Sequence, residues 1–258
     1  MRFGACVSTK LIGNAKDYGY DYCELSGYEI ATYSEKEWCE EKKRILSFNL
    51  PIIGFNSFCN EKLPLIGALV NKDAIISYSK LLLKRGSDLN IKNIGIGAPL
   101  ARKLEDTDNY NVANQQMKWF LTTISEMAKE YNINILYEAL NPYCCNYCNS
   151  SRESYDIVKS INKENLHIVW DVYHSILSNE SYNNIKCLFD EIAHIHICSW
   201  NKINYDRFYL LNKDINYLSE LSNFLKEVNY NKTISIEATD LSFNELGKSS
   251  IELLKSLF

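Results

Sequence analysis

The stretch His167-Ile-Val-Trp-Asp-Val-Tyr-His174 decides how this sequence is interpreted. Its first five residues have the apolar, β-branched character of a short buried strand. The run then stops at the carboxylate of Asp171, and a histidine follows three positions later. A charged residue that closes a hydrophobic strand needs a physical reason, because an unpaired charge is costly to bury.

The same pattern occurs in three more stretches, 133–138, 192–196 and 233–237, which end on Glu138, His196 and Glu237. Side chains alternate along a strand, so each end group shares one face with the residue two positions earlier, and apolar residues take the other face. The four end groups lie roughly one strand-plus-helix unit apart in the chain. If the strands are consecutive and parallel, these groups converge on one point.

The rest of the chain fits eight such units. We predict strands at 2–7, 22–25, 51–55, 93–97, 133–138, 167–171, 192–196 and 233–237. Helices are predicted at 10–18, 34–48, 73–87, about 112–127, 153–161, 185–189, 215–228 and 243–258. This alternation predicts an α/β fold, a (β/α)8 TIM barrel formed as one domain by residues 1–258. The alternative, an open doubly wound sheet, is disfavoured because no Gly-rich phosphate turn follows the first strand.

Composition excludes several classes of protein. A formal charge of −4 and a pI near 5.7 argue against nucleic-acid binding. No apolar run is long enough for a membrane helix and no signal peptide is evident, so we expect a cytoplasmic protein. Nine cysteines then indicate reduced thiols, and the cluster Cys144, Cys145 and Cys148 lacks the further ligands of a zinc site. Whether the chain forms a homo-oligomer stays open.

The four strand-end groups form a set of three carboxylates and one imidazole. One such residue alone is ordinary, because a strand-end Glu is commonly an ion-pair partner and an inward His is commonly a hydrogen-bonded core residue. Three anions brought together without a cation would repel one another. We therefore predict that Glu138, Asp171, His196 and Glu237 bind one divalent metal ion, most plausibly Mn²⁺, with Mg²⁺, Co²⁺ or Zn²⁺ as alternatives.

These motifs and their order resemble the sugar phosphate isomerase/epimerase family of xylose isomerase-like TIM barrels, in particular its ketose 3-epimerase and hydroxypyruvate isomerase branches. The resemblance covers nearly the whole chain. It is carried by Phe55-Asn56 with Leu63-Pro64 and Gly67, the Gly95-Ile-Gly97 to Arg102 loop, Tyr137-Glu-Ala-Leu-Asn-Pro142, Asn146 and Asn149, Asp171-Val-Tyr-His174, His194-Ile-His196, and Ile236-Glu237. It implies the same four metal ligands and a small carbohydrate bound over the metal.

The implied activity is that of a metal-dependent sugar or sugar-phosphate isomerase or epimerase. A metal chelated by a substrate carbonyl and hydroxyl stabilises an enediolate, so that the neighbouring C–H becomes acidic. Glu138 and Glu237 could then remove a proton from one face and return it to the other, or to the adjacent carbon. His174 could orient the substrate or shuttle a hydroxyl proton near neutral pH, and its alternative role is to support Asp171.

Further residues are candidates for substrate binding. Arg207 resembles the arginine that holds a substrate oxygen in the epimerases, and Lys202 competes for this role. Asn56 belongs to a family motif, and Trp200 could stack on a sugar face. Glu24 could touch substrate, with a solvated or paired carboxylate as the alternative. His194 lies one layer deeper in the strand, and we expect it to be structural.

The sequence departs from the family pattern at Cys144, where many relatives carry a glutamate that touches substrate. A thiol is no anion at neutral pH unless its pKa is strongly lowered. Two alternatives therefore stay open, an inosose dehydratase-like lyase on the same scaffold and a metal-binding barrel without turnover. A DNA-repair role like that of endonuclease IV is disfavoured, because its trinuclear cluster needs more histidines than the four present.

Overall fold

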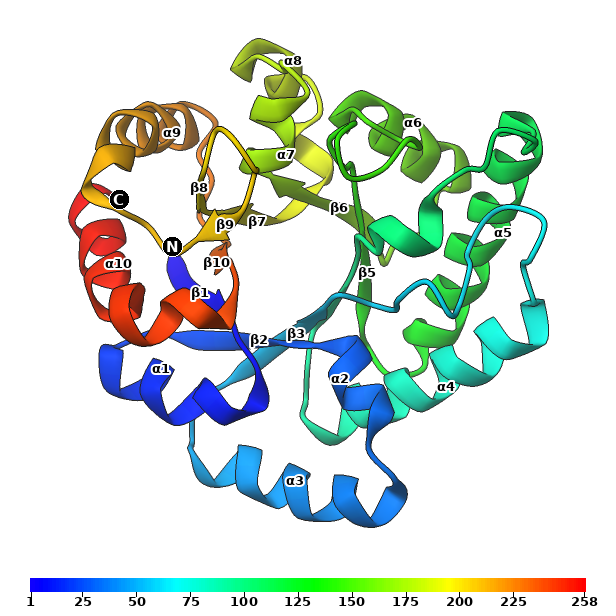
Figure 1. Cartoon of the computed structure of the whole chain (residues 1–258), viewed down its shortest axis with the longest axis horizontal. Coiled ribbons are helices and arrows are strands. Elements are labelled where there is room, and N and C mark those ends of the chain that lie inside the picture. The colour runs from blue at the N-terminus through cyan, green and yellow to red at the C-terminus, as the bar shows by residue number, and fades with distance from the viewer.

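The computed structural model describes residues 1–258, and its centre is a closed barrel of eight parallel strands (Figure 1). Around the barrel the strand order is β1-β10-β7-β6-β5-β4-β3-β2. The strands are β1 (Arg2–Cys6), β2 (Tyr22–Ser26), β3 (Ile52–Asn56), β4 (Asn93–Ile96), β5 (Asn134–Glu138), β6 (Leu166–Asp171), β7 (Ile192–Ile197) and β10 (Thr233–Glu237). The predicted TIM barrel is confirmed, and each predicted strand lies within about two residues of an observed one.

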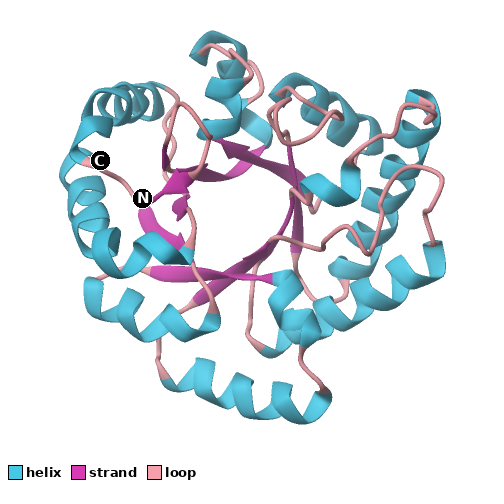
Figure 2. Cartoon of the chain, viewed as in Figure 1, coloured by secondary structure: helices cyan, strands magenta, loops and turns pink.

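Helices surround the barrel on its outside (Figure 2). They are α1 (Ile12–Tyr18), α2 (Gly27–Thr32), α3 (Glu35–Ser47), α4 (Lys72–Asp88), α5 (Tyr110–Lys129), α6 (Ser151–Ile161), α7 (Val172–Leu177), α8 (Tyr182–Lys186), α9 (Ile215–Glu227) and α10 (Phe243–Leu257). The predicted capping box of α3 is present, with Ser34 and Glu37 each bonding the other's backbone N–H. None of the helices combines the length and the hydropathy that crossing a bilayer requires.

The short elements differ from the prediction. In place of one helix at 185–189, the chain forms α7 and α8, and α7 begins because the side chain of Asp171 accepts hydrogen bonds from the N–H groups of Tyr173 (2.8 Å) and His174 (3.2 Å). The loop after β7 contains a small hairpin, β8 (Ser199–Trp200) and β9 (Arg207–Phe208). Elements of two to six residues are too short to show a hydrophobic period, so the pattern could not indicate them.

The outward faces of the strands carry the main core between barrel and helices. Trp170 on β6 is buried and packs edge-on against Phe224 of α9 and Tyr182 of α8, with ring centroids 5.9 and 6.2 Å away. The outward residues of the neighbouring strands, Tyr137, Ile195 and Ile236, are also buried. The polar end groups therefore face the barrel interior, as the alternation predicted.

Close packing inside the barrel depends on a missing side chain at Gly4 of β1. A Cβ atom at this position would lie 2.0 Å from Cε2 of Tyr22, which fills the interior beside it. A Cβ atom at Gly95 of β4 would instead meet its nearest atom, the carbonyl oxygen of Phe55, at an ordinary 3.6 Å. The two glycines therefore differ in how much added volume they tolerate.

We predict that Gly4→Ala lowers the free energy of unfolding by about 1–3 kcal/mol, because overpacking forces Tyr22 out of its position. Gly95→Ala is the matched control and should lose less than about 1 kcal/mol, as expected for a change that meets no close atom. Urea unfolding followed by circular dichroism measures both values. Equal losses in the two variants would contradict this account of the interior.

Candidate metal centre

Four strand ends bring the predicted ligands together at one mouth of the barrel, the end that faces the viewer in Figure 1. Glu138 ends β5, Asp171 ends β6, His196 lies near the end of β7 and Glu237 ends β10. One ligand atom from each of these residues lies within 4.8 Å of the others. Glu138, Asp171 and His196 are buried, and Glu237 is partly exposed.

The two glutamates of the cluster sit in different electrostatic surroundings. Burial raises the pKa of Glu138 to about 8, and the nearby charges of Glu237 and Asp171 act in the same direction. Burial would also raise the pKa of Glu237, but Arg207 and His196 outweigh it and hold this pKa well below its ordinary value. Nη1 of Arg207 lies 2.8 Å from Oε2 of Glu237 and 3.3 Å from Oδ2 of Asp171.

Two buried atoms of the cluster have no hydrogen-bond partner, Oε1 of Glu138 and Nδ1 of His196. Nδ1 of His196 lies 3.3 Å from Oε2 of Glu237 without forming a hydrogen bond to it. Leaving a buried polar atom unsatisfied costs about 1–3 kcal/mol. Both atoms belong to residues whose ligand atoms converge, so one bound cation would satisfy them together. The residues present therefore fit a divalent metal ion with oxygen and nitrogen ligands.

Glu24 lies beneath His196 and is not among the residues that line the cavity, so of the two alternatives for this residue the structure shows the paired carboxylate and not the substrate contact. Its Oε1 accepts hydrogen bonds from Nε2 of His194 (2.7 Å), Nε2 of His196 (3.2 Å) and the hydroxyl of Ser235 (2.5 Å). A carboxylate that holds the far nitrogen of a metal-binding imidazole fixes the ring and directs the other nitrogen to the metal. Glu24 is thus placed to orient His196.

The ends of β4 and β5 are held by Arg102, which is fully buried. One of its nitrogens donates to the carbonyl oxygens of Ile96 (2.9 Å), Gly97 (2.9 Å) and Glu138 (2.8 Å). A Cβ atom at Gly97 would lie 2.3 Å from Oε2 of Glu138, so only glycine leaves room for this carboxylate. Both residues belong to a motif noted in the sequence, but only the structure reveals that they position Glu138.

His174 has a defined tautomer. Its Nδ1 lies 3.2 Å from the backbone N–H of Asn141, which can only donate, and 2.7 Å from the side-chain Nδ2 of the same residue. The ring proton is therefore on Nε2, which lies 3.7 Å from Oε1 of Glu138 and 3.9 Å from Oδ2 of Asp171. Burial lowers the pKa of His174 to about 4, so the expectation of titration near neutral pH is wrong.

A cavity of about 350 Å³ opens over this cluster. Among its lining residues are Glu138, His174, Arg207, Glu237 and Cys144. Asn56 is next to it, and its side-chain amide donates to Oε1 of Glu237 (3.0 Å). The cavity is large enough for a small polar molecule that reaches the carboxylates.

Two predicted substrate contacts are not brought into this cavity. The ring of Trp200 packs against Tyr173 and Tyr217, with centroids 5.7 Å away in each case, and is not among the lining residues. Lys202 is exposed in the turn of the β8–β9 hairpin and does not line the cavity either. The hairpin, which sequence patterns did not indicate, supplies Arg207, Tyr205 and Asp206 instead.

The thiol of Cys144 is neutral in this environment. Burial raises its pKa to about 12, and Sγ donates to the carbonyl oxygen of Asn141 at 3.4 Å. At this position the cavity wall therefore offers no anion. Cys145 is also bonded to a backbone carbonyl, that of Arg102, and none of the three clustered cysteines belongs to a group of converging metal ligands.

Comparison with protein families finds one match that spans almost the whole chain. Residues 12–257 match the family model described as xylose isomerase-like TIM barrel. A search of curated proteins finds no match.

Solved structures with the same fold include several sugar epimerases. A D-psicose 3-epimerase from Clostridium cellulolyticum H10, solved with D-tagatose, superposes with a TM-score of 0.79 at 14% identity, and the match covers 100% of this chain and 99% of that one. A 3-keto-D-glucoside 4-epimerase from E. coli gives 0.77 at 14% identity and 99% coverage of both chains. The IolI protein, solved with a bound zinc atom, gives 0.74 at 17% identity, covering 100% of this chain and 96% of that one.

We predict that Glu138→Gln stabilises the metal-free protein more at about pH 9 than at about pH 5. The carboxyl ionises at its ordinary pKa in the unfolded chain but at about 8 in the folded one. The free energy of unfolding of the wild type therefore falls as the pH rises between these two pKa values. Glutamine cannot ionise and does not show this loss. The stabilisation by Glu138→Gln should therefore be larger at pH 9 than at pH 5 by at least about 1 kcal/mol.

Urea unfolding in the presence of a chelator measures this difference. Glu252→Gln, on the exposed side of α10 and without an ion pair, is the matched control. A stabilisation by Glu138→Gln that is the same at both pH values would show that this carboxyl is not held protonated by its surroundings.

Proposed function

Because the chain belongs to the xylose isomerase-like TIM barrel family, we propose that it is a divalent-metal-dependent isomerase or epimerase of a small carbohydrate. One observation carries the proposal: four residues bring one ligand atom each within 4.8 Å of the others beneath the cavity, and two of them, Glu138 and His196, have a buried polar atom without a hydrogen-bond partner. The epimerases among the structural relatives support it at the level of the fold.

The metal would be held by Glu138, Asp171, His196 and Glu237. Mn²⁺ is our first choice for this set of ligands, with Mg²⁺, Co²⁺ and Zn²⁺ as alternatives. When bound, such an ion supplies a Lewis acid that draws electron density from a substrate carbonyl and acidifies the neighbouring C–H.

Glu138 and Glu237 are the proposed proton carriers. They stand on β5 and β10, which are separated in the barrel by β6 and β7, so their carboxylates reach the cavity from different sides. A carboxylate on one side of a sugar can remove a proton, and one on the other side can return it. Return to the same carbon inverts that centre, and return to the adjacent carbon moves the carbonyl group.

Two further side chains would orient the substrate. His174 presents an Nε2–H to the cavity and stays neutral, so it can donate a hydrogen bond to a substrate oxygen rather than act as a base. Arg207 already bridges Asp171 and Glu237, and its other nitrogens can donate to a hydroxyl, carbonyl or phosphate oxygen. The neutral thiol of Cys144 offers only weak hydrogen bonding, which disfavours a substrate that needs an anionic acceptor there.

We predict that Asp171→Asn weakens divalent-metal binding by at least about 10-fold, because one anionic ligand is lost. Titration of the chelator-treated protein with Mn²⁺ by isothermal calorimetry measures this. Asp156→Asn, an exposed aspartate on α6, is the control and should bind as the wild type does. Unchanged affinity in Asp171→Asn would remove this residue from the ligand set.

Elemental analysis tests the site as a whole. Protein purified without added metal should carry about one equivalent of Mn, Co, Zn or Mg, and the double variant Glu138→Ala/Glu237→Ala should carry none. The absence of metal from the wild type, even after incubation with Mn²⁺, would contradict the proposed metal-dependent function.

We predict that Glu237→Gln abolishes turnover while the fold is retained, because glutamine cannot accept a proton from carbon. The assay is a screen of ketoses and their phosphates with Mn²⁺ in D₂O, with deuterium incorporation read by NMR and the fold checked by circular dichroism. Full activity in this variant would contradict the two-carboxylate mechanism. Loss of water from the substrate would point to the lyase alternative instead.

A further inference from the structure

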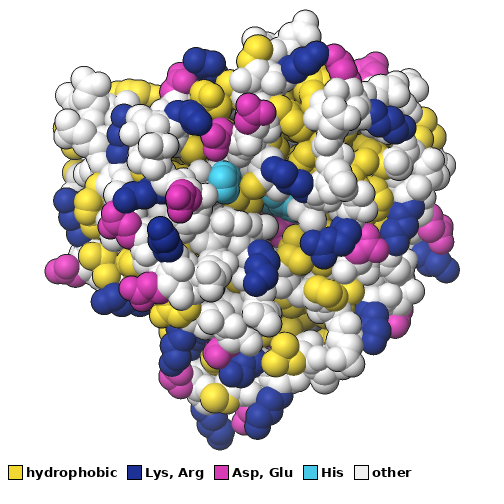
Figure 3. Space-filling view, turned by 180° about the vertical axis from the view of Figure 1, so that it is seen from behind, with side chains coloured by type: hydrophobic (Ala, Val, Ile, Leu, Met, Phe, Trp, Pro, Cys, Tyr) yellow, Lys and Arg dark blue, Asp and Glu magenta, His cyan; other side chains and the backbone are white.

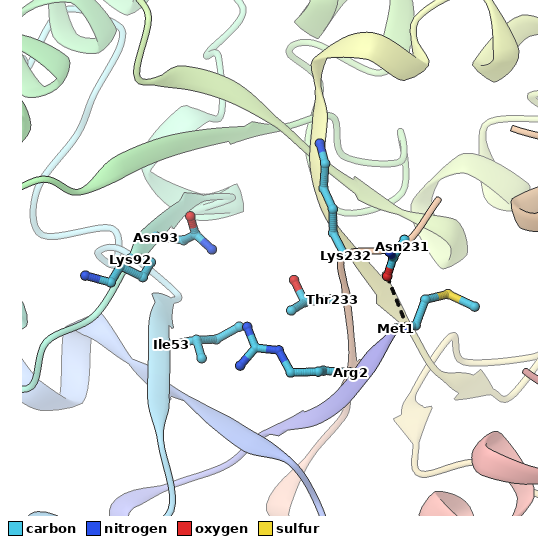
Figure 4. A pocket seen from close by; sticks show the side chains of 8 residues that line it. All are labelled: Met1, Arg2, Ile53, Lys92, Asn93, Asn231, Lys232 and Thr233. Atoms are coloured by element: carbon cyan, nitrogen blue, oxygen red, sulfur yellow. Dashed lines mark hydrogen bonds between the residues drawn. The ribbon is translucent and has the colours of Figure 1, made fainter. Parts of the chain in front are cut away.

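A second cavity, of about 500 Å³, lies at the opposite mouth of the barrel, where the strands begin (Figure 4). It is formed by the first residues of β1, β4 and β10, the residues that precede them, and Ile53 near the start of β3. The lining consists of Met1, Arg2, Ile53, Lys92, Asn93, Asn231, Lys232 and Thr233. Neither the proposed reaction nor the predicted metal ligands involve this mouth.

The charge of this cavity is entirely positive. Arg2, Lys92 and Lys232 line it, none of the lining residues is acidic, and none of these three side chains forms an ion pair. Figure 3 shows this end of the molecule, with Lys and Arg side chains around the central hollow. These three side chains are exposed at the rim, so water screens their mutual repulsion and the arrangement is tolerated without a ligand. Because no carboxylate lines the cavity, their charge remains available to attract an anion.

The cavity is also rich in hydrogen-bond donors. Arg2 lies over the buried ring of Tyr22, with Cζ 5.7 Å from the ring centroid, and Figure 4 shows its guanidinium extending across the mouth between Thr233 and Ile53. The Oδ1 atom of Asn93 accepts a bond from Asn134 (3.2 Å), which leaves the amide N–H groups of Asn93 free to donate.

The two lysines lie on the rim of the cavity. Nζ of Lys232 donates one hydrogen bond, to the carbonyl oxygen of Ile192 (2.9 Å), and in Figure 4 its side chain extends away from Arg2. Lys92 also points away from the centre in Figure 4, and both flexible side chains can turn toward a ligand. The donors of this mouth thus face no carboxylate and are free for an external anion.

We propose that this cavity binds a small polyvalent oxyanion, namely inorganic phosphate or the phosphate group of a small metabolite. An arginine held against an aromatic ring, with lysine and amide donors around it, matches the geometry and charge of a phosphate. The concave shape and the small number of cations suit a compact anion rather than a nucleic-acid backbone, whose binding needs an extended basic surface. The proposal is independent of the reaction proposed for the other mouth.

The test is a titration of the chelator-treated protein with inorganic phosphate by isothermal calorimetry. Removing metal matters because an ion at the other mouth could itself bind phosphate. The wild type should bind phosphate at one site, and Arg2→Gln/Lys232→Gln should bind it at least about 10-fold more weakly, as expected for the loss of two charge-assisted hydrogen bonds. Lys36→Gln/Lys118→Gln, which removes the same charge from exposed helix positions without ion pairs, should bind as the wild type does.

A second variant tests at which of the two mouths phosphate binds. Arg207→Gln removes the arginine next to the metal ligands and should leave phosphate binding unchanged. The fold of each variant is checked by thermal melting without phosphate, where the loss of repulsion should leave the melting temperature of Arg2→Gln/Lys232→Gln at or above that of the wild type.

Glycerol 3-phosphate, titrated in the Arg207→Gln background, identifies the source of the anion. Tighter binding than that of phosphate assigns the site to a phosphorylated metabolite, and equal or weaker binding assigns it to free phosphate. The proposal is overturned by any of three results: no phosphate binding at tens of millimolar, equal affinity in Arg2→Gln/Lys232→Gln, or loss of binding in Arg207→Gln.

Discussion

Repulsion among three carboxylates is the constraint on which this structure depends. Glu138, Asp171 and Glu237 reach the same point at the end of the barrel, where little water can screen them. Arg207 and His196 supply the nearest positive charge within the chain. The pKa of Glu138 is nevertheless raised, first by burial and then by the charges of Glu237 and Asp171, which the two cations offset only in part. Without a metal the cluster lowers its charge by holding the proton of Glu138, and a divalent cation would neutralise the carboxylates in their ionised form, which is why ligand chemistry dominates the proposed function.

Much of the surrounding architecture keeps these groups in place. Gly97 leaves room for Glu138, and Arg102 ties three backbone carbonyls around it. Below the cluster, Glu24 fixes the ring of His196 and also bonds His194, whose other nitrogen lies 2.7 Å from the hydroxyl of Thr233. A series of hydrogen-bonded groups therefore runs through the barrel interior from the proposed metal ligands to the cavity at the opposite mouth. Preorganisation of this kind holds ligands in position before a metal or substrate arrives.

The two mouths of the barrel have opposite electrostatic character. One collects carboxylates over which a cavity of about 350 Å³ opens, and the other is lined by Arg2, Lys92 and Lys232 without any acid. The net charge of −4 does not reveal this separation, because it sums charges of both signs over the whole chain, whereas acidic groups lie at the strand ends and basic groups at the strand starts. Parallel strands make the sorting effective: all their first residues meet at one mouth and all their last residues at the other.

The barrel and the four converging end groups could be predicted from the amino-acid sequence, because period-2 alternation and the regular strand-to-helix spacing are local signals that the closed parallel sheet preserves. The tertiary structure alone decided the pairing of Glu24 with His194, which is 170 residues away in the chain, and the packing of Trp200 away from the cavity. It also decided that His174 is neutral, since burial and the contact with Asn141 set its ionisation. These properties depend on side chains that meet only after the barrel closes, so no pattern along the chain could encode them.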